Sequence, residues 1–291
     1  MSPEPTGAEF RSGAMTGLGV HAAQVAALPA DPRALAVIVQ GLVLHMHWAE
    51  SYGVTPTEAQ RHEAHLRPVE RMLDRLLERD PSPLVVARPP ERRLIGVCRD
   101  FSLLLAAMLR AKGVPARTRC GFATYFEAGR FVDHWVCEYR DGPPGRWVMV
   151  DPQLDRLQRE RLGIDFDPLV VPADRFLTAG AAWAACRSGA ADPRRFGILD
   201  MHGWWFVAGN LVRDLAALND MPMLPWDVWG AMPEPDEPID PERLALFDEL
   251  ARLTADPDAA AAPLRRLYAE DGRLHVPAAV HNALLGRPEI V

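Results

Sequence analysis

The stretch that decides the fold occupies residues 95–101 and reads Ile95-Gly96-Val97-Cys98-Arg99-Asp100-Phe101. A strongly helical run over residues 102–112 follows it, so we expect Cys98 on the first turn of a helix. The positive end of the helix dipole favours a thiolate at that position, and the thiolate is the nucleophilic form of cysteine. Gly113 and Pro115 end the predicted helix. The stretch therefore predicts a helix that begins at a reactive cysteine.

Two predicted strands downstream carry a histidine and an aspartate. Residues 129–140 contain His134, and residues 147–150 lead directly into Asp151. The turn signal at residues 141–145 predicts that these strands pair as an antiparallel hairpin. Such pairing would bring His134 and Asp151 close together near the end of the sheet. With a further strand over residues 116–126, we expect an antiparallel meander beside the Cys98 helix.

The three residues have the chemistry of a thiol catalytic triad. His134 would take the proton of the Cys98 thiol and later give it to the leaving group. Asp151 would fix the tautomer of the imidazole, and the Cys98 backbone N–H would supply one donor to an oxyanion. Taken singly, each residue has a plainer interpretation, as a small buried side chain, a core histidine or a turn opener. Their occurrence together and in this order favours catalysis.

These residues resemble the core of the transglutaminase-like superfamily. The resemblance rests on Gly-Val-Cys-Arg-Asp-Phe at residues 96–101, Asp-His-Trp-Val at 133–136 and Trp-Val-Met-Val-Asp-Pro at 147–152, and it covers roughly residues 93–154. It implies an α+β fold in which a helix packs on an antiparallel sheet, as in papain-type cysteine proteases. It also implies Cys98 as nucleophile, His134 as base and Asp151 as orienter. The chain looks like a stand-alone bacterial member rather than a calcium-dependent crosslinking enzyme.

Composition and periodicity divide the chain into four regions, which we expect to form one structural domain. They are a flexible tail at residues 1–18, a helical region at 19–90, a catalytic core at 91–160 and a helical region at 161–291. In the second region we expect helices at residues 31–51 and 57–79. Beyond the core strands we expect helices at 153–162, 174–189, 204–219, 241–254 and 257–270, a surface linker at 232–238 and a short helical C-terminal tail.

Aromatic and polar residues outside the triad are candidates for substrate binding. The C-terminal third is rich in tryptophan, and aromatic walls with a few polar groups are typical of small-ligand pockets. The buried core of a helical region would need the same residues, so both interpretations stay open. The candidates for substrate contact are Trp48, Trp135, Gln153, Arg213, Asp214 and Asp227.

The bulk properties exclude several classes of protein. A formal charge of −7 over 291 residues argues against nucleic acid as a partner. We also expect no membrane span, because the apolar runs are too short, and no export signal, because the N-terminus lacks an apolar core. Four cysteines without CxxC spacing, and His62 and His65 without HExxH spacing, predict no metal site and no disulfide framework. We expect a reduced, cytoplasmic protein that needs no cofactor.

The sequence as a whole predicts a thiol hydrolase or acyltransferase that forms an acyl-thioester on Cys98. If water accepts the acyl group, the protein is an amidase or peptidase. If an amine accepts it, the protein is an amide-forming acyltransferase. The substrate would be an amide or thioester of a small molecule, a peptide or a carrier-linked acyl group. The alternative is a catalytically silent transglutaminase-like binding module that uses the cleft for recognition.

Overall fold

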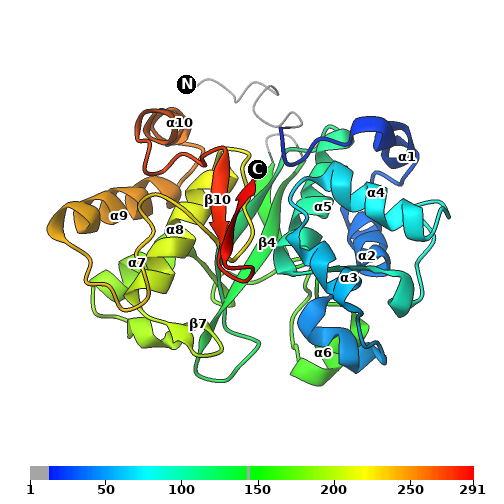
Figure 1. The fold of residues 1–291 in the computed structure, drawn as a ribbon, viewed down its shortest axis with the longest axis horizontal. Helices are drawn as coiled ribbons and strands as arrows, with labels where there is room; N and C mark the ends of the chain where they lie inside the picture. The colour runs from blue at the N-terminus through cyan, green and yellow to red at the C-terminus, as the bar shows by residue number, and fades with distance from the viewer. Residues whose placement is uncertain (1–12, 143–144) are drawn as a thin grey trace. The chain divides into compact units, whose positions relative to one another are not determined.

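The computed structural model describes residues 13–142 and 145–291 (Figure 1). The chain divides into two compact units. The first contains the described residues up to 118 together with 136–171, and the second contains residues 119–135 and 172–291. Strands β3 (Ala116–Ala123) and β4 (Phe131–Asp141) each run from one unit into the other. The two units therefore do not follow the boundaries that the sequence predicts at residues 90 and 160.

The core of the first unit is the helix α5 (Cys98–Ala111), which begins where the sequence predicts. Residues 98–109 are all buried, so this helix is covered on every side rather than along one stripe. Helices α1 (Ala22–Ala26), α2 (Pro32–Leu42) and α4 (Val69–Arg79) pack against it (Figure 1). Gly113 follows the helix with φ of +76°, as a C-terminal glycine should.

The predicted helix at residues 31–51 is too long. Helix α2 ends at Leu42, and the chain continues as strand β1 (Val43–His45) and the 3-10 helix η2 (Met46–Tyr52). Strand β1 pairs in parallel with β2 (Leu94–Gly96), directly before Cys98. The backbone of residues 43–45 is satisfied by a distant strand, which helical periodicity cannot reveal.

The predicted helix at residues 57–79 is divided in three. It consists of α3 (Glu58–Arg61), the 3-10 helix η3 (His62–His65) and α4. The break lies before Pro68, the N-cap of α4, whose ring removes a backbone donor. Thr57 caps α3 as expected, since its hydroxyl accepts a hydrogen bond from Gln60 N at 3.3 Å. A further 3-10 turn, η4 (Pro90–Arg92), precedes β2.

The largest sheet has the strand order β6-β3-β4-β7-β8, with β5 also paired to β4. Strand β5 (Arg146–Val150) runs antiparallel to β4 with Val150 opposite Cys137, which confirms the predicted hairpin. The meander was an incomplete prediction, because three short strands were missed: β6 (Phe176–Thr178), β7 (Phe196–Ile198) and β8 (Met201–His202). Strands of two or three residues carry no usable alternation of polar and apolar side chains. The mixed helix-and-strand class is nevertheless the predicted α+β class.

Four helices of the second unit lie close to their predicted positions: α7 (Ala179–Arg187), α8 (Trp204–Leu218), α9 (Pro241–Thr254) and α10 (Ala261–Glu270). Buried Trp183 on α7 contacts the rings of Trp204 and Phe247, and its Nε1 donates to Asp248 at 2.7 Å. This part of the tryptophan-rich region is therefore packed core. A 3-10 turn, η5 (Pro193–Arg195), precedes β7, and α6 (Arg156–Leu162) belongs to the first unit.

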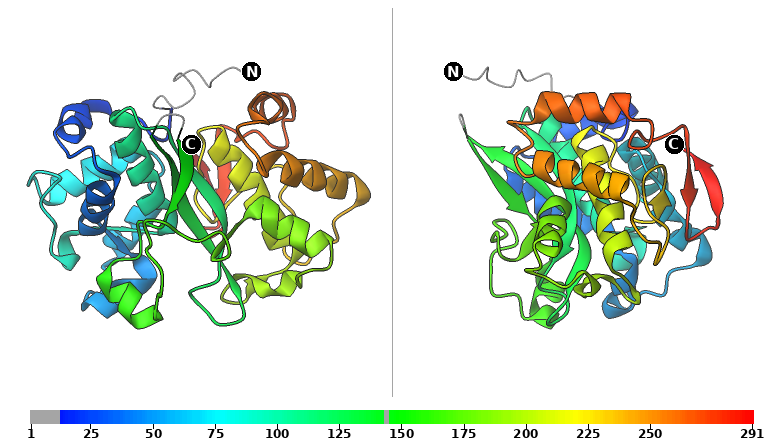
Figure 2. Two further views of the ribbon diagram at one scale, coloured as in Figure 1. Left: turned by 180° about the vertical axis from the view of Figure 1, so that it is seen from behind. Right: turned by 90° about the vertical axis from the view of Figure 1, so that its left-hand side faces the viewer.

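Both chain ends differ from prediction. The C-terminus forms the strands β10 (Ala279–Asn282) and β11 (Arg287–Ile290), a hairpin drawn in red in Figure 2, so the predicted helical tail is wrong. It joins β9 (Asp227–Val228) in a three-stranded sheet. At the N-terminus, Met15 is buried and its carbonyl accepts from Val69 N at 2.9 Å. The predicted flexible tail is therefore wrong for residues 13–18, while residues 1–12 lie outside the described residues.

Glu63 ties three elements of the first unit together. Its carboxylate accepts from Arg75 Nε at 2.9 Å, from Arg79 Nη2 and from the backbone N–H of Ile95 at 3.1 Å. The side chain of Glu63 is only 3% exposed, so these bonds replace its hydration almost completely. The carboxylate thus fixes η3 against both α4 and β2.

We expect Glu63→Gln to lower the free energy of unfolding by about 2 kcal/mol, because two arginines lose a buried carboxylate partner. Urea unfolding followed by circular dichroism measures this change. The matched control is Glu78→Gln, since Glu78 also accepts from Arg75 but is 66% exposed, and its loss should cost less than about 0.5 kcal/mol. Equal losses in the two variants would contradict the structural role of Glu63.

Candidate functional site

Cys98 is the first residue of α5, and the Asp100 carboxylate determines where that helix starts. Asp100 accepts from the backbone N–H of Val97 at 2.8 Å and from Arg99 Nη1 at 2.9 Å. An acidic side chain at the third helical position satisfies an N-terminal N–H and complements the helix dipole. Burial raises the pKa of Asp100, whereas Arg99 and the Val97 N–H oppose that rise. Cys98 itself is 6% exposed, on the best-packed helix of the first unit.

Gly96 makes room for this cap. A Cβ atom at residue 96 would lie 2.8 Å from Asp100 Oδ2 and 3.2 Å from Val43 Cγ1. The glycine is therefore needed for the carboxylate to approach the backbone before Cys98. The predicted motif around Cys98 thus has a local mechanical basis: glycine for space, aspartate for the cap and cysteine for the first helical position.

Asp151 follows strand β5 in the first unit and is completely buried. Its Oδ1 accepts from the backbone N–H of Gln153 at 3.0 Å, and its own N–H donates to the Pro168 carbonyl at 2.8 Å. The Gln153 side chain donates to Gln158 Oε1 at 3.0 Å. Its Oε1 is buried, and no group of the described residues donates to it. The bond between Asp151 and the Gln153 backbone closes a local turn, and the roles of both side chains stay predictions.

His134 lies on β4, in the part that belongs to the second unit, and is 2% exposed. Its ring lies edge-on to three aromatic rings of that unit, with centroid distances of 4.8 Å to Phe126, 6.0 Å to Tyr125 and 6.4 Å to Phe176. These rings exclude bulk water from the imidazole. Along the continuous strand, His134 is three residues from Cys137, whose partner Val150 directly precedes Asp151.

The other candidates for substrate contact are distributed over both units. Trp48 lies half-buried in η2, and Trp135 is completely buried on β4. Asp214 on α8 accepts from Arg119 Nε and Nη2 at 3.0 and 2.8 Å and from Cys120 N at 2.9 Å. These bonds attach α8 to β3 in the buried interior, and a role of Asp214 in substrate binding stays a prediction.

The two remaining candidates belong to a buried polar network of the second unit. Arg213 Nη2 donates to the carbonyl of Asp227 at 3.0 Å, and Arg213 Nη1 donates to Asn210 Oδ1 at 3.1 Å. Asn210 Nδ2 in turn donates to Asp133 Oδ1 at 2.7 Å. Asn210 and Asp133 were not among the predicted site residues. The spacing of three between Asn210 and Arg213 on one helix was the available signal.

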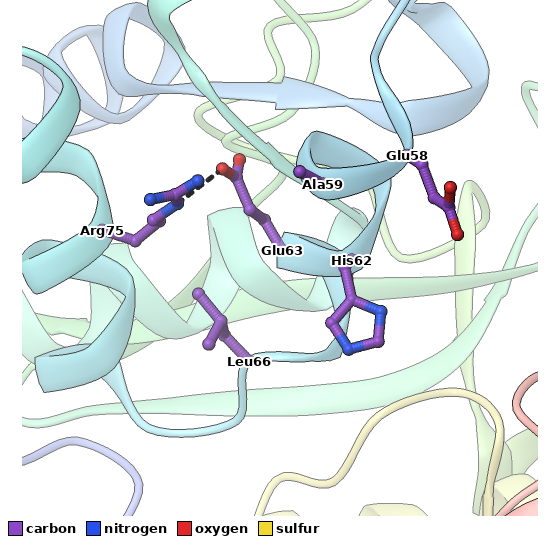
Figure 3. Close-up of a pocket in the computed structure, with 6 residues that line it drawn as sticks. All are labelled: Glu58, Ala59, His62, Glu63, Leu66 and Arg75. Carbon is purple, nitrogen blue, oxygen red and sulfur yellow. Dashed lines mark hydrogen bonds and ion pairs between the residues drawn. The ribbon is translucent and has the colours of Figure 1, made fainter.

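An open hollow of about 530 Å³ lies in the first unit (Figure 3). It is lined by Glu58, Ala59, His62, Glu63, Leu66 and Arg75, and Figure 3 shows Arg75 directed toward Glu63. Its wall is bonded to the segment around Cys98, because Glu63 accepts from Ile95 N and the Leu66 carbonyl accepts from Arg99 Nη1 at 3.4 Å. The sequence did not predict a pocket here.

Three structural findings bear on other functions. All four cysteines lie among the described residues, where they are thiols rather than disulfides. Residues 13–142 and 145–291 contain no group of three or more His, Cys, Asp or Glu side chains placed to hold a metal ion. No helix within the same ranges is long and apolar enough to cross a membrane.

Comparison with known proteins finds a family match for the central segment. Residues 58–152 match the model of the transglutaminase-like superfamily, which confirms the expected resemblance. The match begins at α3, well before the motif around Cys98, and includes all three residues of the predicted triad. No curated protein and no solved structure matches the chain.

We expect Gly96→Ala to destabilise the protein by about 1–3 kcal/mol, because the added methyl group displaces Asp100 from the start of α5. Thermal unfolding measures the change. Gly272→Ala is the control, since a Cβ at residue 272 would meet no atom within 4 Å. If both variants unfold at the temperature of the unsubstituted protein, the proposed need for glycine is wrong.

Proposed function

We propose that this chain is a thiol-dependent acyl-transfer enzyme that forms a covalent acyl-thioester on Cys98. The observation that carries the proposal is the position of Cys98 as the first residue of a 14-residue helix, inside the segment that matches the transglutaminase-like superfamily. Aligned peptide dipoles stabilise an anion at that end of a helix. The Asp100 cap stabilises the helix start at this residue.

His134 is the proposed base and Asp151 the proposed orienter. The antiparallel pairing of β4 and β5 supports this assignment. Val150 lies opposite Cys137, so continuing the register by one residue places Asp151 opposite Val136. Side chains two residues apart on a strand share a face, so His134 shares the face of Val136. We further propose that α5 and this sheet form the papain-like core that the resemblance implies.

The proposed reaction has two steps. In the first step His134 takes the thiol proton, the Cys98 sulfur attacks the carbonyl carbon of the acyl donor, and the developing oxyanion accepts from the Cys98 N–H. The bond from that carbon to the leaving group then breaks, and the leaving group takes the proton from His134. In the second step His134 removes a proton from the acceptor, the acceptor attacks the thioester carbon, and the thiol is restored. The aromatic rings around His134 strengthen its interactions with charge because they exclude water.

Water or an amine would serve as acceptor, which gives an amidase or peptidase on the one hand and an amide-forming acyltransferase on the other. We propose a small-molecule, peptide or carrier-linked acyl donor in the bacterial cytoplasm.

We expect iodoacetamide at pH 7 to alkylate Cys98 at least about 100-fold faster than Cys186, as measured by mass spectrometry of tryptic peptides. Burial raises the pKa of Cys186 to about 11, and burial also raises the pKa of Cys137. Both thiols are therefore almost entirely protonated at neutral pH. As the pH is raised toward 11, the labelling rate of Cys186 should increase about tenfold for each pH unit, whereas the labelling rate of Cys98 should change little.

His134→Ala is the companion variant, and it should slow the labelling of Cys98 without changing that of Cys186. Similar rates for Cys98 and Cys186 in the unsubstituted protein would contradict an activated thiolate. They would favour the alternative, a binding module that keeps the fold without the chemistry.

With p-nitrophenyl acetate as donor and hydroxylamine as acceptor, we expect acetohydroxamate formation that depends on the triad. Cys98→Ser should remove the acetyl adduct seen by intact-protein mass spectrometry, and His134→Ala should lower kcat about 10³-fold or more. Asp151→Asn should lower it about 10²- to 10⁴-fold, because the wrong tautomer of His134 is favoured. An unchanged rate in Cys98→Ser would exclude Cys98 as the nucleophile.

A further inference from the structure

The segment of β4 that carries His134 lies between two strand ladders. Strand β7 pairs with β4 through Phe131 and Val132, and β5 pairs with it through residues 137–141. Residues 133–136 lie opposite neither β7 nor β5, so the partner strand along this edge of β4 changes there. Strand β3 is hydrogen-bonded to β4 along its other edge.

A hydrogen bond between two side chains holds the residue that follows the last pair of β4 with β7. Asp133, the residue directly after Val132, accepts from Asn210 Nδ2 at 2.7 Å. Asp133 is 7% exposed and Asn210 is 1% exposed, so the bond is shielded from water. Because successive side chains of a strand point to opposite faces, Asp133 is held on one face and His134 meets its aromatic rings on the other.

Arg213 completes the network from one helical turn further along α8. Its Nη1 donates to Asn210 Oδ1, which sets the orientation of the amide, so that Nδ2 faces Asp133. Arg213 is itself held by the Asp227 carbonyl. Gly209 provides the space, since a Cβ there would lie 3.1 Å from Arg213 Nη1.

Together these contacts resemble a positioning device more than core packing. Burying a carboxylate, an amide and a guanidinium costs free energy that apolar packing at the same place would not cost. Burial lowers the pKa of Arg213 and raises that of Asp133, because the charged form of each group loses hydration. The constraint is applied at the residue next to the proposed base.

We propose that Asp133, Asn210 and Arg213 are positioning residues that hold the His134 imidazole in its reactive orientation. The inference rests on the proposed function, because it assigns these residues a role only through His134. A displacement of about 1 Å at a reacting group can lower a rate about 100-fold. The network is therefore expected to act on kcat, with little effect on substrate binding.

The test exchanges the two bonded side chains. Asn210→Asp alone sets two carboxylates against each other and should lower kcat for p-nitrophenyl acetate about 10- to 100-fold, with KM changed by less than about twofold. Asp133→Asn combined with Asn210→Asp keeps one amide and one carboxylate and should restore kcat to within about threefold. Asn219→Ala is the control at the C-cap of the same helix, because the Asn219 side chain donates to the Leu215 carbonyl and not to the network, and kcat should not change.

The outcomes separate this inference from the proposed function. If His134→Ala leaves Cys98 labelling and kcat unchanged, both the triad and the positioning role are overturned. If His134→Ala lowers both while folded Asn210→Asp does not, only the positioning role is overturned. A folded exchange variant that fails to recover kcat also overturns it. Should Asn210→Asp not fold, Asn210→Ala removes the bond without adding charge, and the same fall in kcat is expected.

Discussion

The start of one buried helix is the constraint on which the rest of the first unit depends. The Asp100 carboxylate accepts from the backbone before Cys98 and from Arg99, and so caps the helix that begins at the cysteine. Strand β2 leads directly into the start of this helix, and the Glu63 carboxylate of η3 holds β2 by accepting from the Ile95 N–H. A short acidic side chain, a glycine and a distant glutamate thus determine where the sulfur atom lies.

The continuous strand β4 has a corresponding role for the imidazole. One part of it pairs with β5 and leads toward Asp151, and another part pairs with β7. His134 lies between these two ladders, among aromatic rings on one face and with a bonded Asp133 directly before it. Strand β3 pairs with the other edge of β4, and the buried bond between Asp133 and Asn210 adds a side-chain constraint directly before His134.

The family match and the hydrogen bonds around Cys98 are independent observations that agree. The match over residues 58–152 concerns the pattern of the sequence, whereas the cap at Asp100 and the space at Gly96 are physical reasons for that pattern. The helices that follow β5 lie outside the match. One of them, α8, contacts Asp133 and Arg119, so it constrains two strands, β4 and β3, that lie within the matched segment.

The sequence by itself determined the helix at Cys98, the hairpin that carries His134 and leads to Asp151, and most helices of the C-terminal region. These features depend on caps, turns and periodicity within about a dozen residues, which a single segment encodes. Only the tertiary structure decided that residues 43–45 form a strand, that residues 196–202 extend the sheet, and that the C-terminus is a hairpin. The same holds for Asn210 and Asp133, which are 77 residues apart, because a bond between distant segments leaves no periodic trace in the sequence.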